Sequence, residues 1–247
     1  MRALEKVASY DDAFFDSQVE GALRSARAVV PHVLELTPIT SVVDLGCGRA
    51  AWLAAFAELG VTDSLGIDGH YVDQSKLLID RSRFRAADLC RPIDVGRRFD
   101  LALCLEVGEH LPGRASTILV ESLAAAAPLV LFSAAIPGQG GTSHINEQWP
   151  VYWERRFNQL GYQRLDLVRP KIWQNQDVEL WYQQNLYLYA TGPGLDQLKW
   201  NHPMTAEDDP SLELIREGVL ARYQSFRGLI RETVRAGARA IRNRLTR

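Results

Sequence analysis

The sequence predicts an α/β protein with a doubly wound, mostly parallel sheet of seven strands that carries an antiparallel hairpin at one edge. Short apolar runs alternate with helical patterns along the chain, as in repeated strand–helix–strand units. Most of these runs are apolar without a break, which is typical of strands buried on both faces of a parallel sheet. Two later runs have too little chain between them for an ordinary helix, so we expect them to be antiparallel neighbours.

The elements follow in order. A helix is predicted from Ala13 to about Leu36, ahead of the first strand. The five parallel strands are predicted at residues 41–46, 64–69, 84–89, 99–107 and 128–136. Helical spacing of apolar residues predicts helices at 50–60, 114–127 and 149–161. The antiparallel pair is predicted at 162–170 and 180–190.

These elements suggest three segments. Residues 1–40 are predicted to form a helical lid over a ligand, with a plain packing helix as the alternative. Residues 41–191 hold the sheet and form the main domain, and residues 192–247 form a linker and a basic amphipathic helix. That last segment carries nine arginines and three glutamates after residue 210. It is expected to lie on an anionic membrane surface, to pair with another helix in a partner or homodimer, or to pack on its own domain.

Composition excludes several classes of protein. With 47% apolar and 23% charged residues, the chain is an ordinary globular protein rather than a disordered one. The net charge of −2 gives no general attraction for nucleic acid. The three cysteines include no CxxC pair, so a disulfide or zinc framework is not expected. Without a signal-peptide pattern or an apolar run of roughly 20 residues, the protein is expected to be cytoplasmic, with contact at the inner face of the membrane as one alternative.

A glycine-rich turn follows the first predicted strand. Residues 43–50 read VDLGCGRA, in which Gly46, Cys47 and Gly48 allow a tight turn and close approach of a ligand. An acid, Asp44, stands just before the glycines. A carboxylate at this place repels phosphate but accepts hydrogen bonds from an ammonium group, which indicates a ligand with an amino-acid moiety.

Two more acids stand at the ends of the next two strands. Asp68, beside Gly69, lies about 20 residues beyond the glycines, where an acid accepts hydrogen bonds from ribose hydroxyls. Asp88, beside Leu89, ends the third predicted strand. Each acid alone is also compatible with a simple helix cap. Together they are expected to line the crevice at the carboxyl ends of the strands, where open α/β sheets bind ligands.

The DLGCG run resembles the first motif of class I S-adenosylmethionine-dependent methyltransferases, which have a Rossmann-like fold. The antiparallel edge also resembles that fold. The resemblance implies S-adenosylmethionine as cofactor and places Asp88 against the adenine amino group. Ala50 replaces the third glycine of the fuller family motif, and its small side chain is expected to permit close packing.

A second cluster follows the fourth predicted strand, in the run LEVGEHLP at 105–112. Glu106, Glu109 and His110 are spaced i, i+3 and i+4, so one helical turn is expected to bring them together. The loop after the fifth strand, GQGGTSHINEQW at 138–149, adds His144 at the same edge of the sheet. Carboxylates and imidazoles gathered on one patch suggest a cation between them.

This cluster resembles the metal-binding set of small-RNA 2′-O-methyltransferases and the E-x-x-E-H of ubiquinone-pathway O-methyltransferases. The resemblance implies that Glu106, Glu109, His110 and His144 hold one divalent ion. Its two imidazoles favour manganese, iron, cobalt or zinc over magnesium. The alternatives are a metal-free site with His110 as general base and Glu109 orienting it, a solvated or cofactor-contacting Glu106, and an uninvolved His144.

Residues 25–190 also resemble methyltransferases of bacterial glycan and secondary-metabolite gene clusters, which favours a sugar or other small hydroxylated acceptor. Six aromatic side chains could stack on sugar faces, although core packing explains any one of them better; they are Trp149, Tyr152, Trp153, Trp173, Trp181 and Tyr182. The sequence therefore predicts an O-methyltransferase. Methylation of an RNA ribose is an alternative, disfavoured by the acidic main domain. A non-catalytic cofactor-binding protein is another, disfavoured by the charged cluster.

Overall fold

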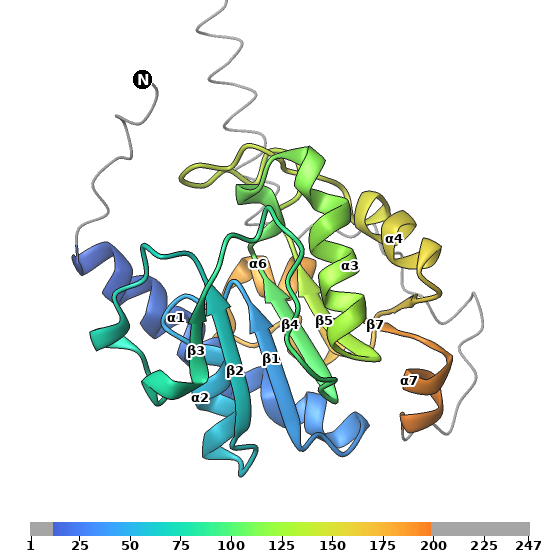
Figure 1. The fold of residues 1–247 in the computed structure, drawn as a ribbon, viewed down its shortest axis with the longest axis horizontal. Coiled ribbons are helices and arrows are strands. Elements are labelled where there is room, and N and C mark those ends of the chain that lie inside the picture. Colours follow the sequence, from blue (N-terminus) through green and yellow to red (C-terminus); the bar gives the residue numbers. More distant parts are fainter. Residues whose placement is uncertain (1–11, 199–247) are drawn as a thin grey trace, which may run out of the picture.

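A seven-stranded sheet in the order β3-β2-β1-β4-β5-β7-β6 forms the centre of the computed structural model, which describes residues 12–198, with side chains from residue 19 onward (Figure 1). The strands, in chain order, are β1 Ser41–Leu45, β2 Asp63–Asp68, β3 Phe84–Ala86, β4 Leu101–Leu105, β5 Leu129–Ser133, β6 Gln163–Leu165 and β7 Tyr187–Ala190. The helices are α1 Asp12–Leu36, α2 Ala51–Glu58, α3 Ser116–Ala126, α4 Pro150–Gln159, α5 Arg169–Ile172, α6 Leu180–Asn185 and α7 Gly192–Gln197.

The pairing of the strands confirms the predicted fold class. Strand β1 pairs in parallel with both β2 and β4, β2 with β3, and β4 with β5. Strand β7 pairs antiparallel with β5 on one side and β6 on the other. The strand order reverses at β1, between β2 and β4, so the crevice of a doubly wound sheet opens at the carboxyl ends of these strands.

Both faces of the sheet are covered, which explains the unbroken apolar runs. Along β4, Leu101 and Leu103 pack in one core with residues of α1 and α2. The alternate residues Ala102 and Cys104 pack in a second core with residues of α3 and α4. Successive side chains of a strand point to opposite faces, so a strand between two layers of helices needs an apolar residue at every position.

The run at 180–190 differs from its prediction, because only its second half is a strand. Residues Leu180–Asn185 form α6, and the chain enters β7 at Tyr187. The helix is held by buried polar contacts: Gln183 Nε2 donates to the carbonyls of Asn175 (2.8 Å) and Val178 (2.6 Å). Two short helices, α5 and α6, therefore join the antiparallel strands in place of a direct hairpin.

The N-terminal helix α1 packs along α2 and also contacts α5. Arg27 donates to both carboxylate oxygens of Glu58 at the end of α2 (2.8 and 2.6 Å), and Lys171 of α5 donates to Glu35 (2.9 Å). A lid formed by residues 1–40 stays a prediction, and the predicted basic helix at 211–247 lies outside the described residues. Within residues 12–198, no helix is both long and apolar enough to cross a bilayer.

Candidate active site

The glycine turn after β1 is built by close contact with its neighbours. The backbone N–H groups of Gly46 and Cys47 donate to the carbonyl of Ile67 in β2 (2.7 and 3.3 Å). Gly46 has a φ of +93°, and a Cβ added there would lie 2.3 Å from the Val107 side chain. A left-handed backbone without room for a side chain requires glycine. Ala50 is also left-handed (φ +64°), a conformation that glycine adopts without the steric cost of a Cβ.

Asp44 and Asp68 lie buried beside this turn, at the ends of adjacent strands. Their residues are 2% and 4% exposed. Asp68 accepts hydrogen bonds from the N–H groups of Gly48 (2.7 Å) and Gly69 (2.6 Å) and from the Tyr71 hydroxyl (2.5 Å). The Tyr71 hydroxyl thus occupies an acceptor position that the sequence assigned to a ribose hydroxyl. Burial and the nearby charge of Asp68 raise the pKa of Asp44 to about 7.

Asp88 is placed differently from the other two acids. Strand β3 ends at Ala86, so Asp88 stands in the loop beyond it, with a side chain 59% exposed. Its carboxylate accepts from the N–H of Cys90 (2.9 Å) and lies 3.6 Å from Arg91, while Leu89 beside it is buried. The carboxylate therefore caps a local turn in this structure and remains accessible to a ligand.

Glu109 and His110 lie on a 3-10 turn, Gly108–His110, that follows β4. Glu109 is completely buried, and neither of its carboxylate oxygens has a hydrogen-bond partner among the described residues. Burial and the nearby charge of Glu106 raise the pKa of Glu109 well above its usual range. His110 is more exposed, yet desolvation and the neighbouring His144 lower its pKa, so its imidazole is neutral at pH 7.

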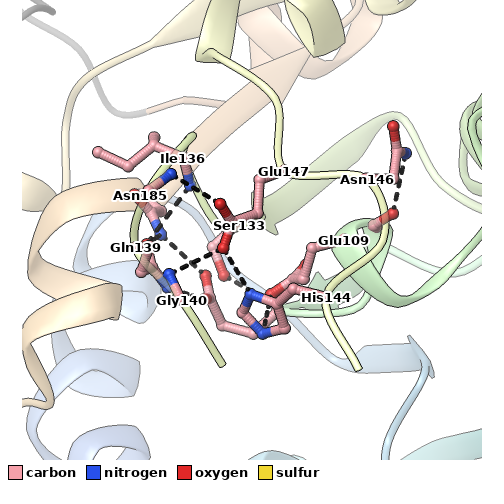
Figure 2. Close-up of polar contacts among 12 residues, drawn as sticks. Glu109, Ser133, Ile136, Gln139, Gly140, His144, Asn146, Glu147 and Asn185 are labelled. Atoms are coloured by element: carbon pink, nitrogen blue, oxygen red, sulfur yellow. Dashed lines mark hydrogen bonds and ion pairs between the residues drawn. The ribbon is translucent and has the colours of Figure 1, made fainter. Parts of the chain in front are cut away.

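The loop between β5 and α4 brings His144 to this turn (Figure 2). The His144 ring meets His110 edge-on, with centroids 4.9 Å apart, and its Nε2 lies 4.0 Å from Glu109 Oε1. The backbone N–H groups of Ile145 and Asn146 both donate to the Glu109 carbonyl (2.9 and 3.0 Å). The buried Asn146 side chain donates to the Gly108 carbonyl (3.2 Å). These bonds fix the loop against the turn.

Glu106 does not share the single helical turn that its spacing predicted. It precedes the 3-10 turn with a left-handed φ of +56°, an uncommon conformation for a residue other than glycine. Its carboxylate accepts from Gln139 Nε2 (3.0 Å) and Asn185 Nδ2 (3.2 Å). Burial raises the pKa of Glu106, and these amides oppose the rise. The structure therefore ties Glu106 to two amides, and Glu106 lies outside the group of side chains that could hold a metal ion.

The remaining three predicted ligands form a group that could hold a divalent ion. One ligand atom each from Glu109, His110 and His144 lies within 4.8 Å of the others. The unpartnered, buried oxygens of Glu109 are what a cation would satisfy, since an unpaired buried polar group is costly. A donor set of one carboxylate and two imidazoles suits manganese, iron, cobalt or zinc better than magnesium.

The structure also identifies residues that the sequence did not single out. Gln139 is buried against Glu106, and Glu147 accepts a hydrogen bond from the His144 ring (3.0 Å between Nδ1 and Oε1). Asn185 Nδ2 donates to Glu106 (3.2 Å) and to Gln139 (2.9 Å); the contact between Asn185 and Gln139 is drawn in Figure 2. Their spacing in the sequence does not predict these contacts, because the contacts depend on how the 138–149 loop and α6 fold over the sheet edge.

Most of the aromatic residues considered for sugar stacking serve packing. Trp153 is 1% exposed against Phe132, and Tyr182 packs edge-on against Trp52 with centroids 5.1 Å apart. Trp149, by contrast, is 44% exposed at the start of α4. Of these aromatic residues, Trp149 has the most surface available to an acceptor near the site.

Gly141→Ala is expected to displace the His144 ring from His110 and Glu109 and so to weaken both Mn²⁺ binding and turnover. A Cβ at Gly141 would lie 2.3 Å from Nε2 of His144, so the methyl group would push this nitrogen away from Glu109. A displacement of about 1 Å at a reacting centre costs on the order of 100-fold in rate. Initial rates and Mn²⁺ titrations would measure the loss. Gly192→Ala, where the added methyl has no atom of the described residues within 4 Å, is the control. Unchanged Mn²⁺ affinity in Gly141→Ala would contradict this expectation.

Burial raises the pKa of Asp44 to about 7. Asp44 is therefore expected to lower the stability of the ligand-free protein as the pH rises from about 4 to about 7. In this window the folded protein keeps a proton that the unfolded chain has released, so each pH unit removes up to about 1.4 kcal/mol of unfolding free energy. Urea unfolding of the wild type and Asp44→Asn at pH 5 to 8 isolates this contribution. A constant difference between the two proteins would contradict it.

Several solved structures share this fold. DesVI from Streptomyces venezuelae has a TM-score of 0.52 at 15% identity, covering 73% of this chain and 96% of DesVI. The methyltransferase domain of bacterial CtHen1-C has a TM-score of 0.52 at 18% identity, covering 69% of this chain and 99% of the domain. Human N-acetylserotonin methyltransferase in complex with SAM has a TM-score of 0.51 at 16% identity, and the match covers 72% of this chain and 55% of the human enzyme. At such identities the likeness shows the class I methyltransferase fold alone. No family model and no curated protein sequence matches the chain.

Proposed function

We propose that the protein is an S-adenosylmethionine-dependent O-methyltransferase that acts on a sugar or another small hydroxylated acceptor. One observation carries the proposal. Two buried carboxylates, Asp44 and Asp68, lie on one side of the strand-order reversal, and the Glu109–His110–His144 group lies at the end of the neighbouring β4. Asp44 and Asp68, which we call the binding half, and Glu109, His110 and His144, the reacting half, therefore lie at the same edge of the sheet. The fold likeness to a methyltransferase solved with SAM supports this assignment.

The binding half suits a nucleoside that carries an amino-acid group. Ionised Asp44 would accept hydrogen bonds from an ammonium group, and its burial makes such a charged contact strong. Asp68 would accept from ribose hydroxyls once the Tyr71 hydroxyl has moved aside. Asp88 is accessible for an exocyclic amino group, and Leu89 offers an apolar neighbour. S-adenosylmethionine supplies the methyl group, activated as a sulfonium.

The reacting half has to hold and deprotonate a hydroxyl. Glu109, His110 and His144 would hold a divalent ion, leaving Glu106 bound to its amides. When bound, such an ion orients an acceptor hydroxyl and lowers its pKa. The Glu109 carbonyl is tied to the loop that carries His144, which keeps the buried Glu109 carboxylate close to both imidazoles.

A metal-free reaction is the second candidate, and the position of His110 favours it. His110 is exposed at the site, and its lowered pKa leaves the imidazole free to accept a proton at neutral pH. Here His110 would take the hydroxyl proton directly as the methyl group is transferred. The two candidates share the binding half and differ only in their response to metal.

Calorimetry combined with turnover tests the proposal. The wild type is expected to bind S-adenosylmethionine and its demethylated product, and to methylate at least one member of a panel of sugars, phenols and short oligoribonucleotides. Dialysis against a chelator should remove turnover, and Mn²⁺ should restore it. Turnover that survives dialysis would select the metal-free route, and methylation of the oligoribonucleotide alone would select an RNA acceptor. Absence of any heat with either nucleoside would refute the binding half.

A further inference from the structure

We infer that Glu147 is a positioning residue that fixes the tautomer of His144 and points its Nε2 at the cation; this inference rests on the proposed metal centre. Glu147 follows His144 by three residues, in the loop between β5 and α4. It was not among the residues that the sequence marked as ligands. Its role is to hold another side chain, not to touch the reacting groups.

The contacts around Glu147 leave its carboxylate little freedom. Oε2 accepts from the N–H of Gly138 (2.7 Å), and Oε1 accepts from the N–H of Gly140 (2.8 Å). Oε1 also lies 3.0 Å from Nδ1 of His144 (Figure 2). With both oxygens already engaged, Glu147 is poorly suited to bind the ion itself, and it lies outside the group of candidate ligands. The backbone of the loop thus clamps the carboxylate in front of the imidazole.

This arrangement decides which nitrogen of His144 carries the proton. An ionised carboxylate only accepts hydrogen bonds, so Nδ1 must be the protonated nitrogen. Nε2 then presents its lone pair, and it is the nitrogen that faces Glu109 at 4.0 Å. Metal-binding histidines commonly have such a carboxylate on the opposite ring nitrogen, which orients the ring and raises its basicity. The His144 side chain is only 12% exposed, so water competes little for Nδ1.

Besides its hydrogen bond to Glu147, the His144 ring is restrained by contact with His110. His110 meets the His144 ring edge-on, at an interplanar angle of 85°. A flipped His144 ring would exchange Nδ1 and a carbon against Glu147 and lose this hydrogen bond. The carboxylate therefore selects one orientation of the ring as well as one tautomer.

Glu147→Gln tests the inference in the full chain. Glutamine lacks the negative charge that holds the proton on Nδ1 and weakens the acceptor there. Where its NH2 group turns to Nδ1, the proton must move to Nε2, which blocks the ligand position. With ¹⁵N-labelled histidine, NMR of the metal-free protein should show the Nδ1–H form of His144 in the wild type and its loss in the variant. Mn²⁺ titration by calorimetry should show an affinity about 10- to 100-fold weaker. Glu147→Asp, which keeps the carboxylate, should retain the Nδ1–H form.

A matched control is available on α1. Glu35 stands three residues after His32, with Nδ1 and Oε2 3.5 Å apart, so Glu35→Gln makes the same chemical change at the same spacing. This control should leave the His144 tautomer and Mn²⁺ affinity unchanged.

The outcomes separate this inference from the metal centre on which it rests. Wild-type affinity for Mn²⁺ and an unchanged tautomer in Glu147→Gln would overturn the inference. A loss of stability in all Glu147 variants, with the tautomer intact, would reduce Glu147 to a loop cap and also overturn it. Absence of Mn²⁺ binding by the wild type, with the tautomer still shifted in the variant, would overturn the metal centre while supporting the control of His144 by Glu147.

Discussion

Glu109→Gln is expected to abolish tight Mn²⁺ binding and to lower turnover by about 1,000-fold, while the metal-free protein melts within a few degrees of the wild type. The substitution keeps the shape of a completely buried side chain, whose oxygens have no partner among the described residues, and removes its ability to become charged. Several kcal/mol of transition-state stabilisation by an ion would be lost with it, and each 1.36 kcal/mol is a factor of ten.

Differential scanning fluorimetry with and without Mn²⁺, together with initial rates, measures both effects. Glu121→Gln, on the exposed surface of α3, makes the same change where no site is expected. Full turnover of chelator-treated Glu109→Gln would refute the metal centre and leave His110 as the base.

Asp44→Asn is expected to weaken binding of S-adenosylmethionine by at least 30-fold. Truncating one partner of a buried charge pair costs about 2–5 kcal/mol, which corresponds to factors of about 30 to several thousand. The asparagine keeps the size of the aspartate but presents an amide where the ammonium group requires a full negative charge. Burial raises the pKa of Asp44 to about 7, so wild-type affinity should itself weaken as pH falls below about 7.

Isothermal calorimetry at pH 8 gives the affinity of each protein. Asp63→Asn provides the control, because Asp63 begins the neighbouring strand β2 at the opposite edge of the sheet, where it pairs with Arg97. An Asp44→Asn variant that binds the nucleoside as tightly as the wild type would exclude an ammonium contact at this position.

The fold could be predicted from the sequence because strands that are buried on both faces of a sheet appear as nearly continuous apolar runs. The five predicted runs became strands β1 to β5. Strands β1, β4 and β5 are buried at every position, whereas β3, which is shorter than its run and stops at Ala86, is only partly buried. The run at 180–190 was not divided from sequence, and its first half is a helix that buried contacts such as those of Gln183 stabilise. Periodicity reports burial, and a short buried helix cannot be distinguished from a short buried strand by periodicity alone.

The site was less accessible to sequence reasoning than the fold. The spacing of Glu109 and His110 placed them on one turn, and the loop position of His144 suggested the same sheet edge. The spacing of Glu106 misled, because a regular helical turn was assumed where the chain makes a left-handed step before a 3-10 turn. Glu147 gave no signal, because an acid three residues from a histidine in a loop is common and only the folded loop gives it a role.

The strand order also governs how the protein can be assembled on the ribosome. Among the strands of residues 12–198, β7 comes last in sequence, yet it lies between β5 and β6. Until about residue 190 has left the exit tunnel, β5 presents an open edge and β6 has no neighbour in the sheet, which exposes the nascent chain to mispairing. The amide of Asn185 reaches Glu106 only at this stage. Insertion of β7 therefore completes the sheet and the surroundings of the Glu106 carboxylate in one step.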